Sequence, residues 1–420
     1  MGLLNTFSIL FAFTALFSFV NHKYIRLPQT IGLLIASLVI SIALIAIAWI
    51  FPGAELFTGP IASLNGLSDI FSETLLQGML GFLLFAGALH INLNDLVKQR
   101  AIITILATFG VVVSTFLIGL SSYYLFNFLG FEIGFLYCLI FGAIISPTDP
   151  IAVLGILKMV KAPKSLETKI AGESLFNDGV GVVVFAVLLA IAKAGGWELY
   201  MQHHGYTDIL IHFVLEAAGG VALGLVLGSG VYFLLRSVDD YPLEIMLTLA
   251  LVLGGSSIAG ILHVSGPLAM VVAGLLIGNR GRLYAMSEKT NSQLFSFWEL
   301  IDDFLNAILF FIIGFILIGI DLKLRYIGLG LISIPLVLLI RLGCIAAPVK
   351  ALSQWFEFSN GAISVMTWGG LRGGISIALA LSLPSDVEIV EVIQTITYVV
   401  VVFSIVVQGL TIGPLIKRTL

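Results

Sequence analysis

The chain contains few charged residues for its length. Only 10% of its 420 residues are Asp, Glu, Lys or Arg, whereas 59% are hydrophobic. A water-soluble domain carries roughly 25% charged residues on average, so this composition excludes that class. The net charge of −4 therefore says less than the positions of the charges along the chain. The composition predicts a multi-pass membrane protein.

Cysteine is also scarce. The two cysteines, Cys138 and Cys344, both lie inside apolar segments, which excludes a disulfide framework. Two thiols also argue against a pump for soft metals, which prefer several sulfur ligands. The sequence contains no phosphate-binding glycine loop, no Cys/His metal spacing and no nucleic-acid motif. We therefore expect neither a cofactor nor a nucleotide-driven pump.

Long apolar runs fill most of the chain. A hydrocarbon core of about 30 Å requires about 20 apolar residues per helix. Thirteen such segments can be identified, and the first has neither a basic region nor a cleavage site of the kind that marks a signal peptide. The segments are 3–21, 28–50, 72–91, 101–126, 133–157, 166–194, 209–236, 243–262, 265–280, 294–320, 326–349, 360–383 and 389–416.

The basic residues are distributed unequally between the loops. If the thirteen segments alternate in direction, fifteen of the twenty Lys and Arg residues fall on one side of the membrane and three on the other. The remaining two, Arg341 and Arg372, lie inside spans. Because basic loops stay in the cytoplasm, this distribution predicts a cytoplasmic C-terminus and an N-terminus outside.

Two of the apolar segments are interrupted near their middles. Residues 146–150 read Ser-Pro-Thr-Asp-Pro in the fifth span, and residues 368–374 read Trp-Gly-Gly-Leu-Arg-Gly-Gly in the twelfth. Proline and repeated glycine disfavour a continuous helix. Non-helical backbone at membrane depth persists only where it is buried in protein or lines a polar cavity. The layout predicts an all-α transporter with inverted six-helix repeats and two broken, crossing helices.

The sixth span carries the densest group of polar residues. Residues 172–179 read Gly-Glu-Ser-Leu-Phe-Asn-Asp-Gly, and a spacing of four places Ser174 and Asp178 on one helix face. Glu173 and Asn177 lie on the adjacent face. The glycines after Asp178 would let a neighbouring backbone approach. With the hydroxyl and carbonyl groups at Thr148, these oxygens suit a small hard cation. Alternatively, Ser174 and Asn177 only join helices.

A buried Glu173 needs a basic partner, because an isolated buried carboxylate would take up a proton. The candidates are Arg341 and Arg372, and a structural ion pair with Arg341 is favoured. Asp149 and Arg372 could instead balance the partial charges at the broken helix ends. Together with Asp178 the group holds three acids and two bases. One proton or one monovalent cation would neutralise this site, so their exchange would be electroneutral.

Two further charged groups lie near span ends. Glu299, Asp302 and Asp303 occur early in the tenth span and could form a cation-attracting mouth or merely a helix N-terminus. A basic cluster precedes the sixth span and would attract anionic lipid headgroups. Its members are Lys158, Lys161, Lys164 and Lys169.

Three motifs carry a family resemblance. Residues 145–150, 172–178 and 369–373, in this order, resemble the monovalent cation:proton antiporter family 1, the sodium/proton exchangers of the NhaP type. The resemblance implies thirteen helices and a homodimer. It also implies a dimerisation part, expected mainly from spans 1–3 and 8–10. The ion-translocating core, expected from spans 4–6 and 11–13, would move as in an elevator.

The resemblance also implies roles for single residues. Asp178 would alternately bind a proton and a cation, with Thr148 and Ser174 as oxygen ligands of Na⁺. Asn177 before this aspartate would mark the electroneutral branch, and Glu173 with Arg341 resembles the family's core ion pair. In one departure, residues 85–88 read Phe-Ala-Gly-Ala where many relatives carry an acidic residue, so a ligand from the third span is not expected.

Several alternatives remain open from the sequence. A potassium/proton antiporter would have the same fold. A cation channel or a carrier for an organic solute could use the same membrane carboxylate. An intramembrane aspartyl protease, the one enzyme considered, would use Asp149 and Asp178 as a dyad. We expect a transporter, not an enzyme, in the inner (plasma) membrane, with monovalent cations, protons and lipids as its partners.

Overall fold

The computed structural model describes residues 3–50, 78–203, 205–320, 323–356, 358–384 and 388–419. Within these ranges the chain is helical throughout, and its one extended pairing is an isolated β-bridge between Asp149 and Leu371. The all-α fold class is therefore confirmed. The first residues of the predicted third span, 72–77, lie outside the described ranges.

The helices in the first half of the chain, with the wide π-turns labelled η, are α1 (Leu3–Val20), η1 (Asn21–Ile25), α2 (Gln29–Ile50), α5 (Leu80–Leu89), α6 (Leu93–Lys98), α7 (Arg100–Thr104), η3 (Ile105–Phe109), α8 (Gly110–Phe128), α9 (Phe135–Ile145), α10 (Ile151–Met159), α11 (Lys164–Lys193) and α12 (Trp197–His203). Those in the second half are α13 (Tyr206–Arg236), α14 (Tyr241–Leu262), α15 (Gly266–Leu276), η4 (Ile277–Gly281), α16 (Arg282–Tyr284), α17 (Glu288–Ile316), α18 (Leu324–Leu352), α19 (Ala362–Trp368), α20 (Gly374–Leu381), α21 (Glu388–Phe403), η5 (Ser404–Gln408) and α22 (Gly409–Thr419).

The predicted apolar segments coincide with these helices wherever the structure describes them. Seven continuous helical stretches are long and apolar enough to cross a membrane by themselves. Two shorter apolar helices, α5 and α9, have 10 and 11 residues. The predicted total of thirteen spans counts α9 with α10, and α19 with α20, as one interrupted span each, and it stays a prediction.

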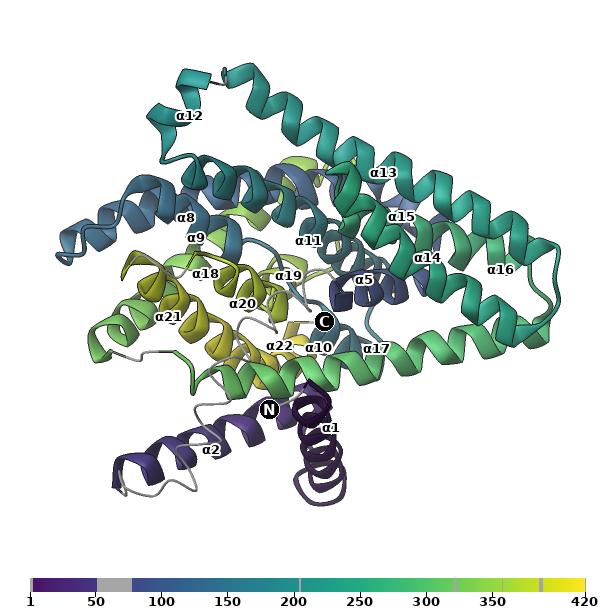
Figure 1. The fold of residues 1–420 in the computed structure, drawn as a ribbon, viewed down its shortest axis with the longest axis horizontal. Helices are drawn as coiled ribbons and strands as arrows, with labels where there is room; N and C mark the ends of the chain where they lie inside the picture. Colours follow the sequence, from purple (N-terminus) through teal and green to yellow (C-terminus); the bar gives the residue numbers. More distant parts are fainter. Residues whose placement is uncertain are drawn as a thin grey trace.

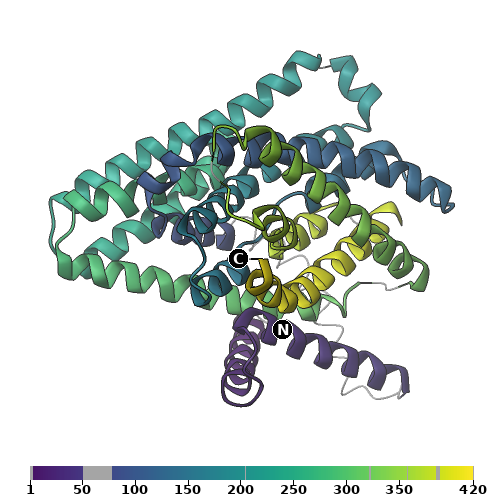
Figure 2. The same cartoon turned by 180° about the vertical axis from the view of Figure 1, so that it is seen from behind.

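The interrupted helices lie in the middle of the molecule. Around α9, α10, α19 and α20 are packed α8, α11, α18 and α21, whereas α5, α13, α14 and α15 form a neighbouring group (Figure 1). The view from behind shows the same arrangement (Figure 2). The long helix α17 passes along α2 and α5 and also reaches α20. It therefore connects the outer helices with the interrupted pair.

Helix α17 begins earlier than the apolar pattern predicted. Its N-terminus is capped by Ser287, whose hydroxyl accepts a hydrogen bond from the backbone of Thr290 at 3.3 Å. Glu288 is the first helical residue, so Asp302 lies near the midpoint of a 29-residue helix, about 21 Å from its start. The interpretation of the acidic group as a helix N-terminus was therefore wrong.

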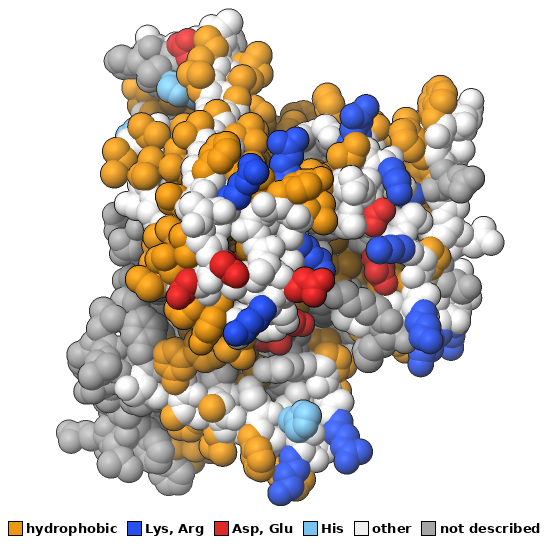
Figure 3. Space-filling model, turned by 90° about the vertical axis from the view of Figure 1, so that its right-hand side faces the viewer, with side chains coloured by type: hydrophobic (Ala, Val, Ile, Leu, Met, Phe, Trp, Pro, Cys, Tyr) orange, Lys and Arg blue, Asp and Glu red, His pale blue; other side chains and the backbone are white. Residues whose placement is uncertain are grey.

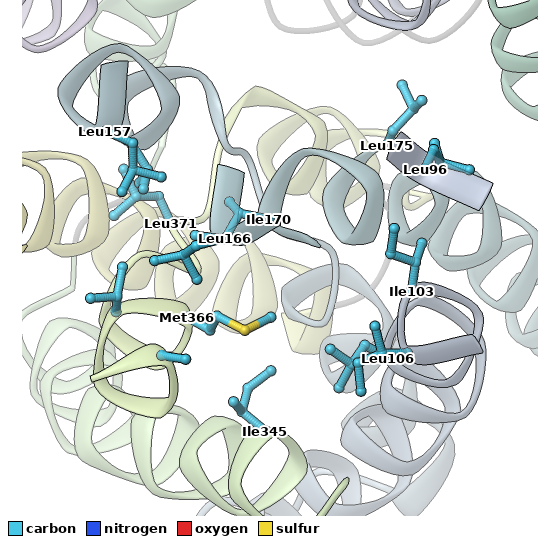
Figure 4. Close-up of a cluster of buried hydrophobic side chains, with 14 of the residues drawn as sticks. Leu96, Ile103, Leu106, Leu157, Leu166, Ile170, Leu175, Ile345, Met366 and Leu371 are labelled. Carbon is cyan, nitrogen blue, oxygen red and sulfur yellow. The ribbon is translucent and has the colours of Figure 1, made fainter. Parts of the chain in front are cut away.

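Close packing holds the interrupted helices from one side. A cluster of buried side chains joins Leu157 of α10, Ile170 of α11, Ile345 of α18 and Met366 of α19 (Figure 4). Leu371, from the non-helical segment between α19 and α20, is buried in the same cluster. In a membrane such close packing, rather than hydrophobicity itself, is a main source of helix association. The cluster therefore fixes the backbone at the second interruption.

The basic cluster before the sixth span does not all face outward. Lys161 and Lys164 are exposed, and Lys164 lies 3.6 Å from Asp95. Lys169 is buried, and its Nζ lies 4.3 Å from the ring centre of Phe358. The prediction that Lys169 attracts lipid headgroups was wrong, because the side chain packs on an aromatic ring inside the protein.

Candidate ion-binding site

The two interruptions meet each other. Helix α9 ends at Ile145 and α10 begins at Ile151, while α19 ends at Trp368 and α20 begins at Gly374. The backbone N–H of Asp149 donates to the carbonyl of Leu371 at 2.7 Å, which forms the isolated β-bridge. Each interruption thus satisfies a backbone group of the other, as buried polar groups require.

A charged side chain lies at each end of the first interruption. The Nη1 of Arg372 donates to the carbonyls of Ser146 at 3.0 Å and Pro147 at 2.9 Å, just after the C-terminus of α9. The carboxylate of Asp149 accepts from the N–H of Ile151 at 2.9 Å, at the N-terminus of α10. Each charge therefore lies at a helix end of opposite partial charge.

Hydrogen bonds from α11 hold Thr148 in place. The Nδ2 of Asn177 donates to Thr148 Oγ1 at 2.8 Å, and its Oδ1 accepts from the Thr148 N–H at 3.3 Å. The hydroxyl of Ser174 donates to the Thr148 carbonyl oxygen. The three side chains are buried. Asn177 uses both the nitrogen and the oxygen of its side-chain amide to bind Thr148, so it holds this residue in position.

Asp178 differs from its polar neighbours. Its side chain is buried, with a relative exposure of 7%, and lies one turn beyond Ser174 on the same face of α11. Within the described ranges no hydrogen bond or ion pair reaches its carboxylate. A buried acid therefore lies one helical turn from Ser174, which is hydrogen-bonded to Thr148, and the carboxylate and hydroxyl oxygens of these residues are hard donors.

Glu173 is paired with Arg341. Its Oε1 lies 2.6 Å from Nη1 of Arg341, a close ion pair that lacks the directional geometry of a hydrogen bond. The Nη2 of Arg341 also donates to the carbonyl of Met366 at 3.4 Å. Arg341 thus joins α18 to α11 and α19. Of the two arginines considered from the sequence, Arg341 is the partner and Arg372 is not.

The glycines after Asp178 permit close packing, mainly of side chains. A Cβ at Gly181 would overlap the ring of Pro147, and one at Gly179 would lie 2.5 Å from a methyl carbon of Leu268. At Gly179 a backbone atom also approaches, because the nitrogen of Leu268 would lie 3.7 Å from the added Cβ, whereas at Gly181 only ring atoms of Pro147 are close. The ring of Pro147 fills the space that Gly181 leaves, which fixes the first interruption against α11.

Sequence reasoning missed a chain of neutral polar residues at the second interruption. The N–H of Arg372 donates to Ser404 Oγ at 2.9 Å, and this hydroxyl donates to Gln408 Oε1 at 2.6 Å. The Nε2 of Gln408 donates to the carbonyl of Trp368 at 2.9 Å, the last residue of α19. The chain therefore caps backbone groups that the break leaves free. The one signal in the sequence that could have revealed these hydrogen bonds is Gln408, a polar residue in an otherwise apolar span.

The chain was compared with known proteins. Residues 9–418 match the family model described as sodium/hydrogen exchanger, transmembrane. The chain is 47% identical to the Na(+)/H(+) antiporter NhaP of Pseudomonas aeruginosa over 425 residues, which covers 99% of this chain and 97% of that protein. It is 34% identical to the Na(+)/H(+) antiporter NhaH of Halobacillus dabanensis, over 94% of this chain and 93% of that protein.

The fold also matches a solved structure. The sodium proton antiporter MjNhaP1 from Methanocaldococcus jannaschii at pH 8 superposes with a TM-score of 0.75 over 99% of this chain and 98% of that one, at 19% sequence identity. At this identity the match concerns the fold. The family model spans nearly the whole chain, and the relatives are aligned over nearly their full lengths. The chain therefore belongs to the sodium/hydrogen exchanger family, whose members are membrane transporters and not enzymes.

Proposed function

We propose that this protein exchanges Na⁺ for H⁺ across the membrane and that Asp178 alternately binds the two ions. The observation that carries this proposal is the isolation of the Asp178 carboxylate, which is buried and has no partner in the described part of the chain. A buried carboxylate without a basic partner is stable only when a proton or a cation neutralises it. The two ions would therefore compete for one site.

The oxygen atoms near Asp178 would complete a site for Na⁺. The hydroxyls of Thr148 and Ser174 retain lone pairs beyond the hydrogen bonds described above and are hard ligands. Asn177 would position Thr148, because both ends of its amide are engaged there. We therefore assign Asn177 a positioning role within the predicted site and keep Asp178, Thr148 and Ser174 as the proposed Na⁺ ligands.

The charges favour an electroneutral exchange. Glu173 is neutralised by Arg341 at 2.6 Å, and the charges of Asp149 and Arg372 lie at helix ends. Asp178 is then the acid left for a transported ion. One proton and one monovalent cation carry the same charge, so each half of the cycle would move the same charge in opposite directions.

The helix contacts favour two parts that move relative to each other. The helices α8, α9, α11, α18 and α21 contact one another extensively, as do α2, α5, α14, α15 and α17. We propose that the first group, with the interrupted helices, is the ion-translocating core. The second group, with α1, would form the dimerisation part of a homodimer. The core would carry the ion in an elevator-like movement that alternates access.

We also propose the orientation that the basic residues predict, with the C-terminus in the cytoplasm and the N-terminus outside the plasma membrane. The end of the molecule that holds α16 and the start of α17 displays many Lys and Arg side chains (Figure 3). The positive-inside distribution makes this end cytoplasmic. Lys161 and Lys164, which are exposed, would contact anionic lipids.

The decisive test is Asp178→Asn, which keeps the size of the side chain and removes its charge. We expect it to abolish Na⁺-driven proton transport in proteoliposomes, because an amide binds neither ion in the required way. Glu216→Gln on α13 removes a half-buried acid that lies outside the α11 motif and should leave transport intact. Full activity of Asp178→Asn would reject the assignment.

The same proteoliposomes test one of the two alternatives to Na⁺/H⁺ exchange, the potassium/proton antiporter. A potassium/proton antiporter of the same fold would respond to K⁺ in preference to Na⁺ and Li⁺ when the three cations are compared across pH. The protease alternative has no support, since the family consists of transporters. The similarity to the Na(+)/H(+) antiporter NhaP of P. aeruginosa favours Na⁺ as the cation.

A further inference from the structure

One face of α17 is turned toward the interrupted helices. Asp302, Asn306 and Leu309 follow each other at spacings of four and three, so they lie along one stripe of this helix. A Cβ added at Gly374, the first residue of α20, would lie 2.5 Å from a methyl carbon of Leu309, which shows how closely that stripe approaches. Asp302 is also near enough to Asp149 for their charges to interact.

The side-chain amide oxygen of Asn306 has no hydrogen-bond partner among the residues that the structure describes. The Asn306 side chain is 3% exposed, and its Nδ2 donates to Asp302 Oδ1 at 3.1 Å. Its Oδ1 is buried and has no hydrogen-bond partner within the described ranges. An ionised carboxylate only accepts hydrogen bonds, so the amide must turn its nitrogen to Asp302 and leave the oxygen unused. A buried carbonyl without a partner is unfavourable, and a cation would satisfy it.

The surroundings are negatively charged. Glu299 and Asp303 lie within one turn of Asp302 and are exposed, whereas Asp302 is half-buried. Among the residues that the structure describes, none of these three acids forms an ion pair. From Asn306 onward α17 is almost continuously buried. The stripe thus leads from exposed acids to a buried amide oxygen opposite the second interruption.

We propose that Asp302 and Asn306 form a second cation station on α17, through which Na⁺ passes between the cytoplasmic end of this helix and Asp178. The inference rests on the proposed function, because it supplies the route to the same carboxylate. The ligands would be a carboxylate oxygen and the free amide oxygen, which are hard donors for a partly hydrated alkali cation. Neither Asp302 nor Asn306 belongs to the core motifs.

Such a station would act on cation capture rather than on translocation. Acidic side chains near an entry point raise the local cation concentration and the rate of association. Loss of one ligand should therefore raise the apparent KM for Na⁺ and leave the maximal rate nearly unchanged. The effect should also depend on the side of the membrane, since only cations that enter along α17 would meet the station.

The experiment compares matched variants in vesicles of known orientation, with Na⁺ supplied on either face. For Asn306→Leu and Asp302→Asn we expect the apparent KM for cytoplasmic Na⁺ to rise at least fivefold, with a maximal rate within twofold of wild type. Asp303→Asn removes the same charge from a neighbouring exposed position that is not a proposed ligand, and it should raise KM clearly less than Asp302→Asn does. Asn306→Asp keeps an oxygen ligand and should not raise KM.

Other outcomes would contradict the proposal of a second cation station at Asp302 and Asn306. A lower maximal rate at unchanged KM, an equal effect of Asp303→Asn, or an equal shift from both faces would assign Asp302 and Asn306 a structural or long-range role. If Asn306→Leu lowers the yield of folded protein, the half-exposed Asp302→Asn decides. A result against the cation station can be distinguished from a result against the proposed function, because the proposed function is tested by Asp178→Asn alone.

Discussion

At the scale of single residues, two acids on α11 have opposite surroundings. Glu173 and Asp178 lie five positions apart, and both are buried. Glu173 has Arg341 at 2.6 Å, whereas Asp178 has no partner in the described part of the chain. A charge fixed by an ion pair cannot readily exchange its partner, while an unpaired one can. The difference supports the proposal that the first acid is structural and that the second binds the transported ions.

The Glu173–Arg341 pair gives the first prediction at this scale. Glu173→Leu or Arg341→Met alone leaves one buried charge uncompensated, which typically costs about 3–5 kcal/mol. The double variant removes both charges and should be close to wild type in stability. Thermal unfolding of the purified protein in detergent measures this. Destabilisation of the double variant by the sum of the single effects would contradict a direct pair.

The partner of Glu173 was foreseeable, because a buried carboxylate needs a base and Arg341 and Arg372 are the basic residues that lie well inside predicted spans rather than at their ends. The position of Arg372 against the carbonyls of Ser146 and Pro147 separates the two candidates, and only coordinates supply it. The free oxygen of Asn306 was not foreseeable either. Whether an amide oxygen finds a donor depends on the side-chain direction and on neighbours distant in sequence.

At the scale of helices, α8 and α9 pack backbone against backbone. A Cβ at Gly142 would overlap the carbonyl oxygen of Thr115 and lie 3.2 Å from the nitrogen of Gly119. Helix backbones in membranes approach in this way only where small residues face each other. The packing of α9 against α8 therefore requires glycine at position 142.

Gly142→Ala should consequently separate the two helices. Overpacking typically costs about 1–3 kcal/mol, and the shift would propagate to Thr148 through the end of α9. Gly343→Ala on α18 is the matched control, because a Cβ there meets nothing within 4 Å. We expect only the first to lower the unfolding temperature in detergent and to impair Na⁺ transport. Equal effects of the two variants would contradict this account.

The sequence predicted the helices better than it predicted their ends. Proline and glycine located both interruptions, because these residues act on the backbone locally. The start of α17 was misplaced from Glu288 to 294, because the span rule counts apolar residues while the helix continues in polar surroundings as far as its Ser287 cap. The contact between the two interruptions follows from the tertiary fold and was predicted only through the proposed repeat.

At the scale of the whole molecule, the balance of charges decides how transport responds to the membrane potential. If one proton exchanges for one monovalent cation, the cycle moves no net charge. An imposed potential of about 100 mV would change the work of a cycle that moved one charge by about 2.3 kcal/mol. It should leave an electroneutral cycle nearly unaffected.

The measurement uses proteoliposomes in which a potassium gradient with an ionophore sets the potential. We expect the initial rate of Na⁺/H⁺ exchange to change less than twofold between 0 and about 100 mV of either sign. A reconstituted electrogenic antiporter serves as the control for the imposed voltage. A steep voltage dependence would mean that Asp178 is not the sole acid that exchanges ions.

The backbone hydrogen bond between Asp149 and Leu371 has a consequence for mutational scanning. It joins peptide groups and no side chains, so it can form with any amino acid except proline at position 149. A scan in which every residue is exchanged for alanine would pass over it. Only a change to the main chain itself, such as proline at position 149 or an ester in place of that amide, would remove it, and the two interruptions would then be joined by side-chain hydrogen bonds such as those from Arg372 to Ser146 and Pro147.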